Sequence, residues 1–189
     1  MRKRTRQVSV GGVLIGGDSP VKIQSMTTTK TSDTEGTAAR RGGREEGGGE
    51  IGAAPVADEA DARAIAAVKG KIRIPLVADI HFSPRLAVLA VENGADKIRI
   101  NPGNIGGERE IAYVADCVRA HHIPVRVGAN TGSIEKEFLE KYGRSAEALV
   151  GSALYNVGIL ERHGVEDIVI SVKASDVPLT TKAYALLSE

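Results

Sequence analysis

The sequence predicts an α/β fold of the TIM-barrel type: a parallel (β/α) barrel that is incomplete in this chain and preceded by an N-terminal β-hairpin. Short apolar runs alternate with helical patterns along the chain, which indicates parallel βα units. The runs are rich in Val, Ile and Leu and stop abruptly at polar residues, as in strands that are buried on both faces. Because 189 residues are fewer than the roughly 250 of a complete barrel, we expect about six βα units.

The amino-terminal elements are a hairpin and one strand. Residues 7–15 contain two short β-type runs on either side of Gly11 and Gly12, which is a two-residue hairpin signal. We expect this hairpin to cap the floor of the barrel. Residues 21–27 then predict the first strand, which ends at Gln24, Ser25 and a run of threonines.

Residues 36–52 interrupt the pattern, because seven of these seventeen residues are glycine. Each glycine inside a helix costs about 0.5–1 kcal/mol relative to alanine, so we expect a flexible loop here. A phosphate-binding glycine loop is disfavoured, since neither a Gly-x-Gly-x-x-Gly nor a Walker pattern is present. A strand at about residues 50–54 is expected only if this region keeps its place in the barrel.

Downstream, helices and strands alternate with clear boundary signals. Asp58 and an acidic first turn open a helix that ends at Lys69, as the helix dipole favours, while Pro84 opens the next helix, which ends at Gly94. Strands are predicted at residues 73–78, 96–100, 123–128 and 167–172. Helices are predicted at residues 58–69, 84–93, 108–121, 134–162 with an interruption at 142–144, and from 178 onward.

Composition and charge exclude several classes of protein. The net charge of +1 creates no global field that would attract nucleic acid or an anionic membrane, so any anion recognition must be local. The basic amino terminus is not followed by the apolar core of a signal peptide, and no run approaches the roughly 18 apolar residues of a membrane span, so we expect a cytoplasmic protein. The single cysteine, Cys117, excludes an internal disulfide and a cysteine-only metal site, and its helical pattern predicts a small buried residue.

Polar side chains gather at the ends of the predicted strands, and in a parallel barrel these ends meet at one mouth. They are Gln24, Ser25, Asp79, His81, Arg99, Asn101, Asn104, Arg126, Asn130, Ser171, Lys173 and Ser175. Asp79 and His81 lie on one side of their strand, where the carboxylate can orient the imidazole or both can act as acid–base partners or hydroxyl anchors. A metal pair is a weaker alternative, because no third ligand is evident. His121 and His122 close a helix and predict a solvated cap.

Arg99, Arg126 and Lys173 are the most informative of these residues, because each lies within or against an apolar run where a buried charge needs a partner. The alternative for each cation is an exposed side-chain end or an ion pair with Asp79, Asp96, Asp167 or Asp176. Three cations on successive strands, with only Asp79 at their level, predict a site for a polyanion. Arginine binds phosphate oxygens in bidentate fashion, and lysine adds a point charge.

Five motifs resemble the amino-terminal barrel of the 4-hydroxy-3-methylbut-2-en-1-yl diphosphate synthase family. They lie at residues 24–27, 78–82, 97–106, 126–133 and 171–176. The resemblance implies an oxidoreductase of the non-mevalonate pathway of isoprenoid biosynthesis. Such an enzyme opens the ring of 2-C-methyl-D-erythritol 2,4-cyclodiphosphate reductively and forms (E)-4-hydroxy-3-methylbut-2-enyl diphosphate. The resemblance also implies a 4Fe-4S cluster, ferredoxin or flavodoxin as reductant, and a homodimer.

The same resemblance implies roles for individual residues. Asp79 and His81 would be catalytic, facing the carbon skeleton and hydroxyls of the substrate. The substrate-binding residues would be Gln24, Ser25, Arg99, Asn101, Arg126, Asn130, Lys173 and Ser175. No residue of this chain is expected to bind a metal, because the cluster ligands belong to a C-terminal domain that residues 1–189 lack. We therefore expect this chain to bind the diphosphate without performing the redox step alone. The alternatives are a non-catalytic barrel for a phosphate ligand and a barrel transferase for pterin-type substrates.

The sequence departs from the family between about residues 36 and 57. There the family has an amphipathic first helix and a second strand ending in a phosphate-binding arginine, whereas this chain has the glycine-rich stretch and Ala53. Because the spacing is unchanged, we hypothesise a pair of compensating frameshifts in a GC-rich coding sequence. A substituted but working helix is the alternative.

Overall fold

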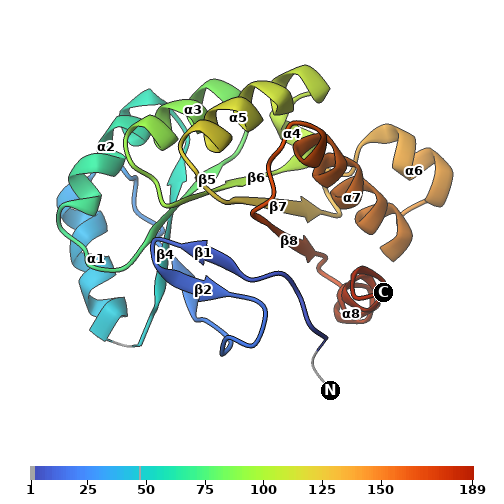
Figure 1. The fold of residues 1–189 in the computed structure, drawn as a ribbon, viewed down its shortest axis with the longest axis horizontal. Coiled ribbons are helices and arrows are strands. Elements are labelled where there is room, and N and C mark those ends of the chain that lie inside the picture. Colours follow the sequence, from blue (N-terminus) through green and yellow to red (C-terminus); the bar gives the residue numbers. More distant parts are fainter. Residues whose placement is uncertain (1–2, 47) are drawn as a thin grey trace.

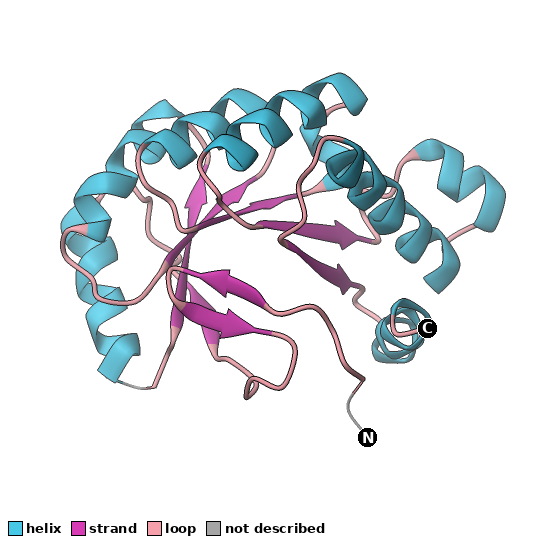
Figure 2. Ribbon diagram, viewed as in Figure 1, coloured by secondary structure: helices cyan, strands magenta, loops and turns pink. Residues whose placement is uncertain are grey.

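The computed structural model describes residues 3–46 and 48–189, and its centre is a curled sheet of six parallel strands in chain order. The strands are β3 (Gln24–Met26), β4 (Ile51–Val56), β5 (Leu76–Ile80), β6 (Lys97–Ile100), β7 (Val125–Asn130) and β8 (Ile168–Lys173). Helices cover the outer, convex side of this sheet, so the strands surround one interior (Figures 1 and 2). This arrangement confirms the predicted partial barrel.

The helices that alternate with these strands follow the signals in the sequence. They are α1 (Thr34–Glu46), α2 (Glu59–Lys69), α3 (Pro84–Glu92), α4 (Pro102–Ile105), α5 (Glu108–Ala120), α6 (Lys136–Tyr142), α7 (Ala146–Arg162) and α8 (Val177–Leu187). The Asp58 carboxylate accepts a hydrogen bond from the backbone N–H of Asp61 at the start of α2, and Ser145 caps α7 in the same way. His121 and His122 are exposed at the end of α5, which confirms the solvated cap.

Residues 34–46 form helix α1, so the predicted flexible loop is wrong over residues 36–46, whereas residues 48–50 lie outside the helices and strands. The reason is tertiary anchoring. The buried Thr37 hydroxyl donates to the Lys30 carbonyl at 3.0 Å, the Glu35 carboxylate pairs with Lys71, and α1 packs against α2. Such contacts compensate for the poor intrinsic helix propensity of glycine, because packing supplies most of the stability of helices in proteins.

Strand β4 lies between β3 and β5 and pairs with both in parallel. The conditional prediction of a strand near residues 50–54 is therefore confirmed. This placement agrees with the alternative of a substituted helix that still keeps the barrel in register. The frameshift hypothesis concerns the coding sequence and stays a hypothesis.

Two strands lie slightly further along the chain than predicted. The strand expected at residues 73–78 is Leu76–Ile80, and the one expected at 123–128 is Val125–Asn130. Each strand begins immediately after a proline. Proline has no N–H to donate to the ladder of hydrogen bonds, so the regular pairing starts at the next residue. As a consequence, Asp79 and Asn130 belong to the strands themselves and are held by the sheet.

The hairpin closes the floor of the barrel, as expected. Its strands β1 (Val8–Val10) and β2 (Val13–Ile15) are antiparallel, and Val10 packs against inward-facing Ile51, Ala53 and Val77. Cys117 is partly buried and packs against the main core, which agrees with its predicted packing role. Among the described residues, no helix is both long and apolar enough to cross a membrane.

Candidate active site at the carboxyl ends of the strands

A cleft of about 640 Å³ opens at the carboxyl ends of the barrel strands. The predicted residues that line it are Gln24, Asp79, His81, Arg99, Arg126, Asn130, Ser171 and Lys173. Met26, Ala53, Val77, Val172, Thr180 and Tyr184 complete the lining. The structure thus brings Asp79, His81 and all three predicted cations to one place, as expected for a parallel barrel.

The register of the sheet explains this convergence. Asp79 on β5 pairs with Arg99 on β6, and Arg99 pairs with Arg126 on β7, so these three residues share one level of the barrel. Asn130 and Lys173 are register partners on β7 and β8, nearer the mouth. Because side chains alternate between the two faces of a strand, residues two apart point into the same interior.

Asp79 neutralises one of the three cations. Its Oδ1 atom lies 3.0 Å from Nη1 of Arg99, and its Oδ2 atom lies 3.5 Å from Nε2 of His81. Arg99 also donates from Nη2 to the Gly128 carbonyl oxygen at 3.0 Å. A Cβ atom at residue 128 would lie 2.4 Å from Nε of Arg99, so glycine is required for the guanidinium group to take this position. The ion-pair alternative therefore holds for Arg99.

Arg126 and Lys173 have no ion pair with any carboxylate of the described residues. Arg126 donates from Nε to the Ser171 hydroxyl at 2.8 Å, and burial lowers the pKa of its guanidinium group below the usual value. The Lys173 side chain is exposed at the rim. Two positive charges of the cleft thus have no carboxylate partner among the described residues.

Four predicted site residues do not line the cleft: Ser25, Asn101, Asn104 and Ser175. Ser25 lies between two lining residues of β3, and neighbouring side chains of a strand point to opposite faces. Asn101 is buried and accepts a hydrogen bond from the Ser133 hydroxyl at 2.9 Å, so it joins the loops after β6 and β7. Ser175 is exposed in the loop before α8. Their ligand-binding roles remain predictions.

Lys97 is a buried cation inside the barrel that was not among the predicted site residues. Lys97 is only 1% exposed, and its ammonium donates to the Gln24 amide oxygen at 3.3 Å. Burial, and to a lesser extent the Arg126 guanidinium, lower the pKa of Lys97 from 10.5 to about 8. One signal could have revealed it: Lys97 is two residues before Arg99 on the same strand, so both side chains must point inward.

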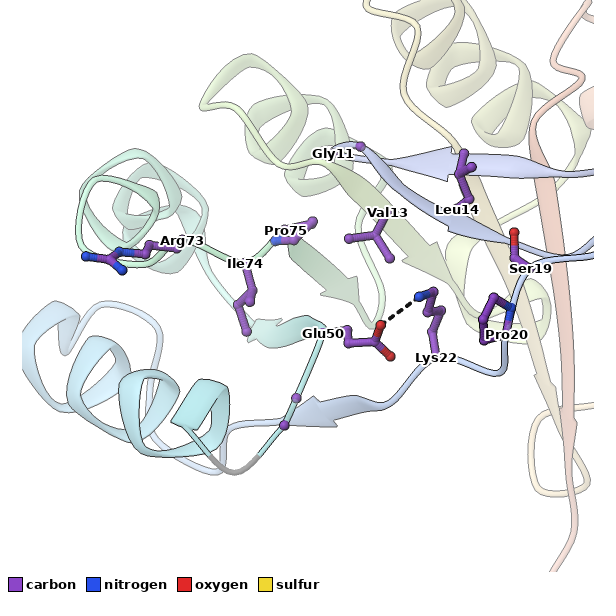
Figure 3. Close-up of a pocket in the computed structure, with 13 residues that line it drawn as sticks. Gly11, Val13, Leu14, Ser19, Pro20, Lys22, Glu50, Arg73, Ile74 and Pro75 are labelled. Atoms are coloured by element: carbon purple, nitrogen blue, oxygen red, sulfur yellow. Dashed lines mark hydrogen bonds and ion pairs between the residues drawn. The ribbon is translucent and has the colours of Figure 1, made fainter.

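A second, larger pocket of about 800 Å³ lies at the opposite end of the strands, beside the hairpin (Figure 3). Glycine and proline residues form much of its wall. The Lys22 ammonium faces the Glu50 carboxylate at 2.7 Å, so this charge pair is already neutralised. Conserved chemistry in barrels belongs to the carboxyl ends of strands, and the amino-terminal end serves stability, so we assign the site to the first cleft.

The described residues do not fit an iron–sulfur cluster. Such clusters are held by several cysteine thiolates, and the chain has one cysteine, on α5 away from the cleft lining. Across residues 3–46 and 48–189, no group of three or more His, Cys, Asp or Glu side chains could hold a metal ion.

Known proteins with this fold include dihydropteroate synthases. The structure of the enzyme from Yersinia pestis matches 96% of this chain and 70% of its own with a TM-score of 0.65 at 10% identity. The enzyme from Vibrio fischeri matches 98% and 73% with a TM-score of 0.65 at 11% identity. At such low identity the likeness shows the barrel fold alone.

Closer relatives are bacterial proteins named 4-hydroxy-3-methylbut-2-en-1-yl diphosphate synthase (flavodoxin). The protein from Desulfotalea psychrophila is 50% identical over all of this chain, which spans 53% of that relative. The protein from Caldanaerobacter subterraneus subsp. tengcongensis is 52% identical, again over all of this chain and 53% of the relative. This chain thus spans about half the length of the relatives that it matches. A family model described as the GcpE TIM-barrel domain matches residues 5–189, and the chain therefore belongs to the GcpE family.

Proposed function

We propose that this barrel binds the diphosphate group of 2-C-methyl-D-erythritol 2,4-cyclodiphosphate. The whole enzyme would open that ring reductively to (E)-4-hydroxy-3-methylbut-2-enyl diphosphate in isoprenoid biosynthesis. The observation that carries the proposal is the convergence of Arg99, Arg126 and Lys173 in one cleft, where Asp79 pairs with the first of them only. The name of the relatives supports the reaction, since two of them are 50% and 52% identical to this chain over its whole length.

The charges of the cleft suit a cyclic diphosphate. Each phosphate group of that ligand carries one negative charge at neutral pH, and Arg126 and Lys173 supply two cations without carboxylate partners among the described residues. Ser171 binds Nε of Arg126, so the terminal nitrogens of the guanidinium group can bind phosphate oxygens. Asn130 lies beside Lys173 in the register and can add an amide donor.

Asp79 and His81 are proposed to face the carbon skeleton. The Asp79 carboxylate contacts both Arg99 and His81, so it holds two side chains in position at the edge of the cleft. The partly exposed imidazole of His81 can transfer a proton to or from a substrate oxygen. A group with this chemistry is needed because ring opening and loss of water require a proton at a departing oxygen.

The electrons are proposed to come from a 4Fe-4S cluster held outside residues 1–189, in a separate C-terminal domain. Flavodoxin, which the names of the relatives include, is the proposed reductant in preference to ferredoxin. We propose that the whole enzyme is a homodimer that works in the cytoplasm. The cluster, the dimer and the compartment are inferred from the family resemblance, and the reductant from the names of the relatives. The diphosphate site is inferred from the cleft alone.

Isothermal titration calorimetry of this chain with the cyclodiphosphate tests the binding proposal. Arg126→Met is expected to weaken binding by at least tenfold, because it removes a buried charge that binds phosphate. Arg119→Met is the matched control, since Arg119 lies exposed on α5 and pairs only with Asp116 among the described residues. This control is expected to bind like the unchanged chain.

A pterin diphosphate in the same titration separates the remaining alternatives. Tighter binding of the pterin ligand would favour a pterin-type transferase over the proposed function. Equal binding of the cyclodiphosphate and inorganic sulfate would favour an unselective phosphate-binding barrel. Equal loss of binding in the Arg126 and Arg119 variants would refute the assignment of the cleft.

A further inference from the structure

Lys97 is a buried cation that the proposed diphosphate site does not yet use. Its side chain is among the largest fully buried ones in the described structure. Lys97 and Arg99 are two apart on β6, so both point into the barrel, with Lys97 one level nearer the floor. Its hydrogen-bond partner is the neutral amide oxygen of Gln24 at 3.3 Å. Burying a charged amine with so few polar contacts is costly, which calls for a functional reason.

A chamber of about 420 Å³ below the cleft links Lys97 to the proposed ligand site. Lys97 lines this chamber, and Gln24 and Arg126 line both the chamber and the cleft. The Arg126 guanidinium is close enough to Lys97 to lower its pKa by repulsion. An anion bound to Arg126 would therefore act on Lys97 through the same low-dielectric interior.

The other groups around Lys97 leave its charge without compensation. The charged and titratable groups that line the chamber and the cleft are Lys22 with its partner Glu50, Asp79 on β5, His81 after β5, Arg99 on β6, Arg126 on β7, Lys173 on β8 and Tyr184 on α8. Asp79 is engaged by Arg99, and Glu50 by Lys22. The floor on the side of β2 and β4 is apolar, with Ile15 and Ile51. Among the described residues, no carboxylate forms an ion pair with Lys97.

We propose that Lys97 is a proton-linked positioning residue of the diphosphate site. Above neutral pH it is partly neutral while the site is empty, and it takes up one proton from solvent when a diphosphate binds beside Arg126. This inference rests on the proposed function and deepens it. The charged ammonium attracts the ligand from below and holds the Gln24 amide at the boundary between chamber and cleft. The pKa of Lys97 is about 8 in the empty site, and a nearby anion raises it. The proton uptake should therefore occur at pH values where binding can be measured.

The sign of the pH dependence follows from the pKa of Lys97. Well below pH 8 the amine is already charged in the empty site, so binding needs no proton. At pH 9 only about one-tenth of the empty sites carry the charge, so each binding event takes up about 0.9 proton. The affinity at pH 9 is then expected to be about tenfold lower than at pH 7.

Calorimetric titration with the cyclodiphosphate in buffers of different ionisation enthalpy measures this uptake directly. The cyclodiphosphate suits the experiment, because its acidic oxygens stay ionised throughout the range from pH 7 to pH 9. The unchanged chain is expected to show uptake that rises from pH 7 to pH 9. Lys97→Met is expected to show weaker binding and no uptake, whereas Lys97→Arg keeps its charge and is expected to bind equally well at pH 7 and pH 9 without uptake.

Lys182→Met is the matched control, since Lys182 is an exposed lysine on α8 that pairs with Glu147, and it is expected to keep the uptake.

NMR of ¹³Cε-labelled lysines in the unchanged chain adds a test that does not depend on a variant: one resonance should titrate near pH 8 and shift its midpoint upward with ligand. Binding without proton uptake, or uptake that persists in the Lys97 variants, would overturn this inference and leave the proposed function standing. Absence of binding at every pH would overturn the proposed function instead.

Discussion

Replacing Lys97 by methionine should stabilise the protein at neutral pH. Methionine has a similar length and can pack against the apolar floor, while the charged amine is 1% exposed. A fall in the pKa of Lys97 from 10.5 to about 8 corresponds to about 3 kcal/mol of unfavourable free energy at pH 7. Loss of the hydrogen bond to Gln24 offsets about 1 kcal/mol of this. We therefore expect the free energy of unfolding to rise by about 2 kcal/mol.

The stability advantage of Lys97→Met should fall as the pH rises. Because the pKa of Lys97 is lowered on folding, the unfolded chain binds more protons than the folded one between about pH 8 and pH 10.5. The stability of the unchanged protein therefore rises over this interval, and the advantage of the variant should nearly vanish by pH 10. Urea unfolding at pH 7 and pH 10 measures this difference in stability. Far-ultraviolet circular dichroism is the suitable probe, because the chain has no tryptophan whose fluorescence could report unfolding.

The exposed Lys182→Met variant serves as control and should change stability by less than about 0.5 kcal/mol at either pH. A Lys97→Met variant that is less stable than the unchanged protein by the same amount at pH 7 and pH 10 would refute the reasoning. That result would mean that burial of the charged Lys97 ammonium does not destabilise the folded protein.

Three further perturbations test the geometry of the cleft and its supports. Gly128→Ala places a methyl group 2.4 Å from Nε of Arg99, so cyclodiphosphate affinity should fall at least tenfold in calorimetry. Gly132→Ala is the control and should bind normally, because an added Cβ atom at residue 132 meets no neighbouring atom within 4 Å. Asp79→Asn removes the one paired carboxylate and should tighten anion binding several-fold while lowering stability; weaker binding would contradict the charge count. Asp61→Ala should lower the free energy of unfolding in urea by about 2–3 kcal/mol, because the buried carboxylate accepts hydrogen bonds from backbone N–H groups of two loops. A loss below about 0.5 kcal/mol would show that these loops do not need the carboxylate.

Much of the fold could be predicted because its signals are local. The alternation of apolar runs with helical periods, the prolines before helices and the glycines after them depend on a few neighbouring residues each. The glycine-rich segment 36–52 was the exception. Its helix depends on contacts with distant residues, such as the pairing of Glu35 with Lys71, which local propensity does not contain.

The convergence of Asp79, His81 and the three cations in one cleft was predictable, because strand ends of a parallel barrel meet at one mouth. The placement of Asn101 was not predictable, since it depends on a hydrogen bond with Ser133, 32 residues further along the chain. The same holds for Ser25, whose position depends on the twist and phase of a very short strand.

The barrel, the order of its elements and the family could all be inferred from the amino-acid sequence, because they follow from periodicity and from motifs of adjacent residues. Which charges are compensated could be seen only in the three-dimensional fold. Asp79 meets Arg99 across two strands, while Lys97 is buried against Gln24, 73 residues away, beside Arg126 and without a carboxylate partner among the described residues. The physical reason is that compensation and desolvation depend on distance in space, which sequence separation does not measure.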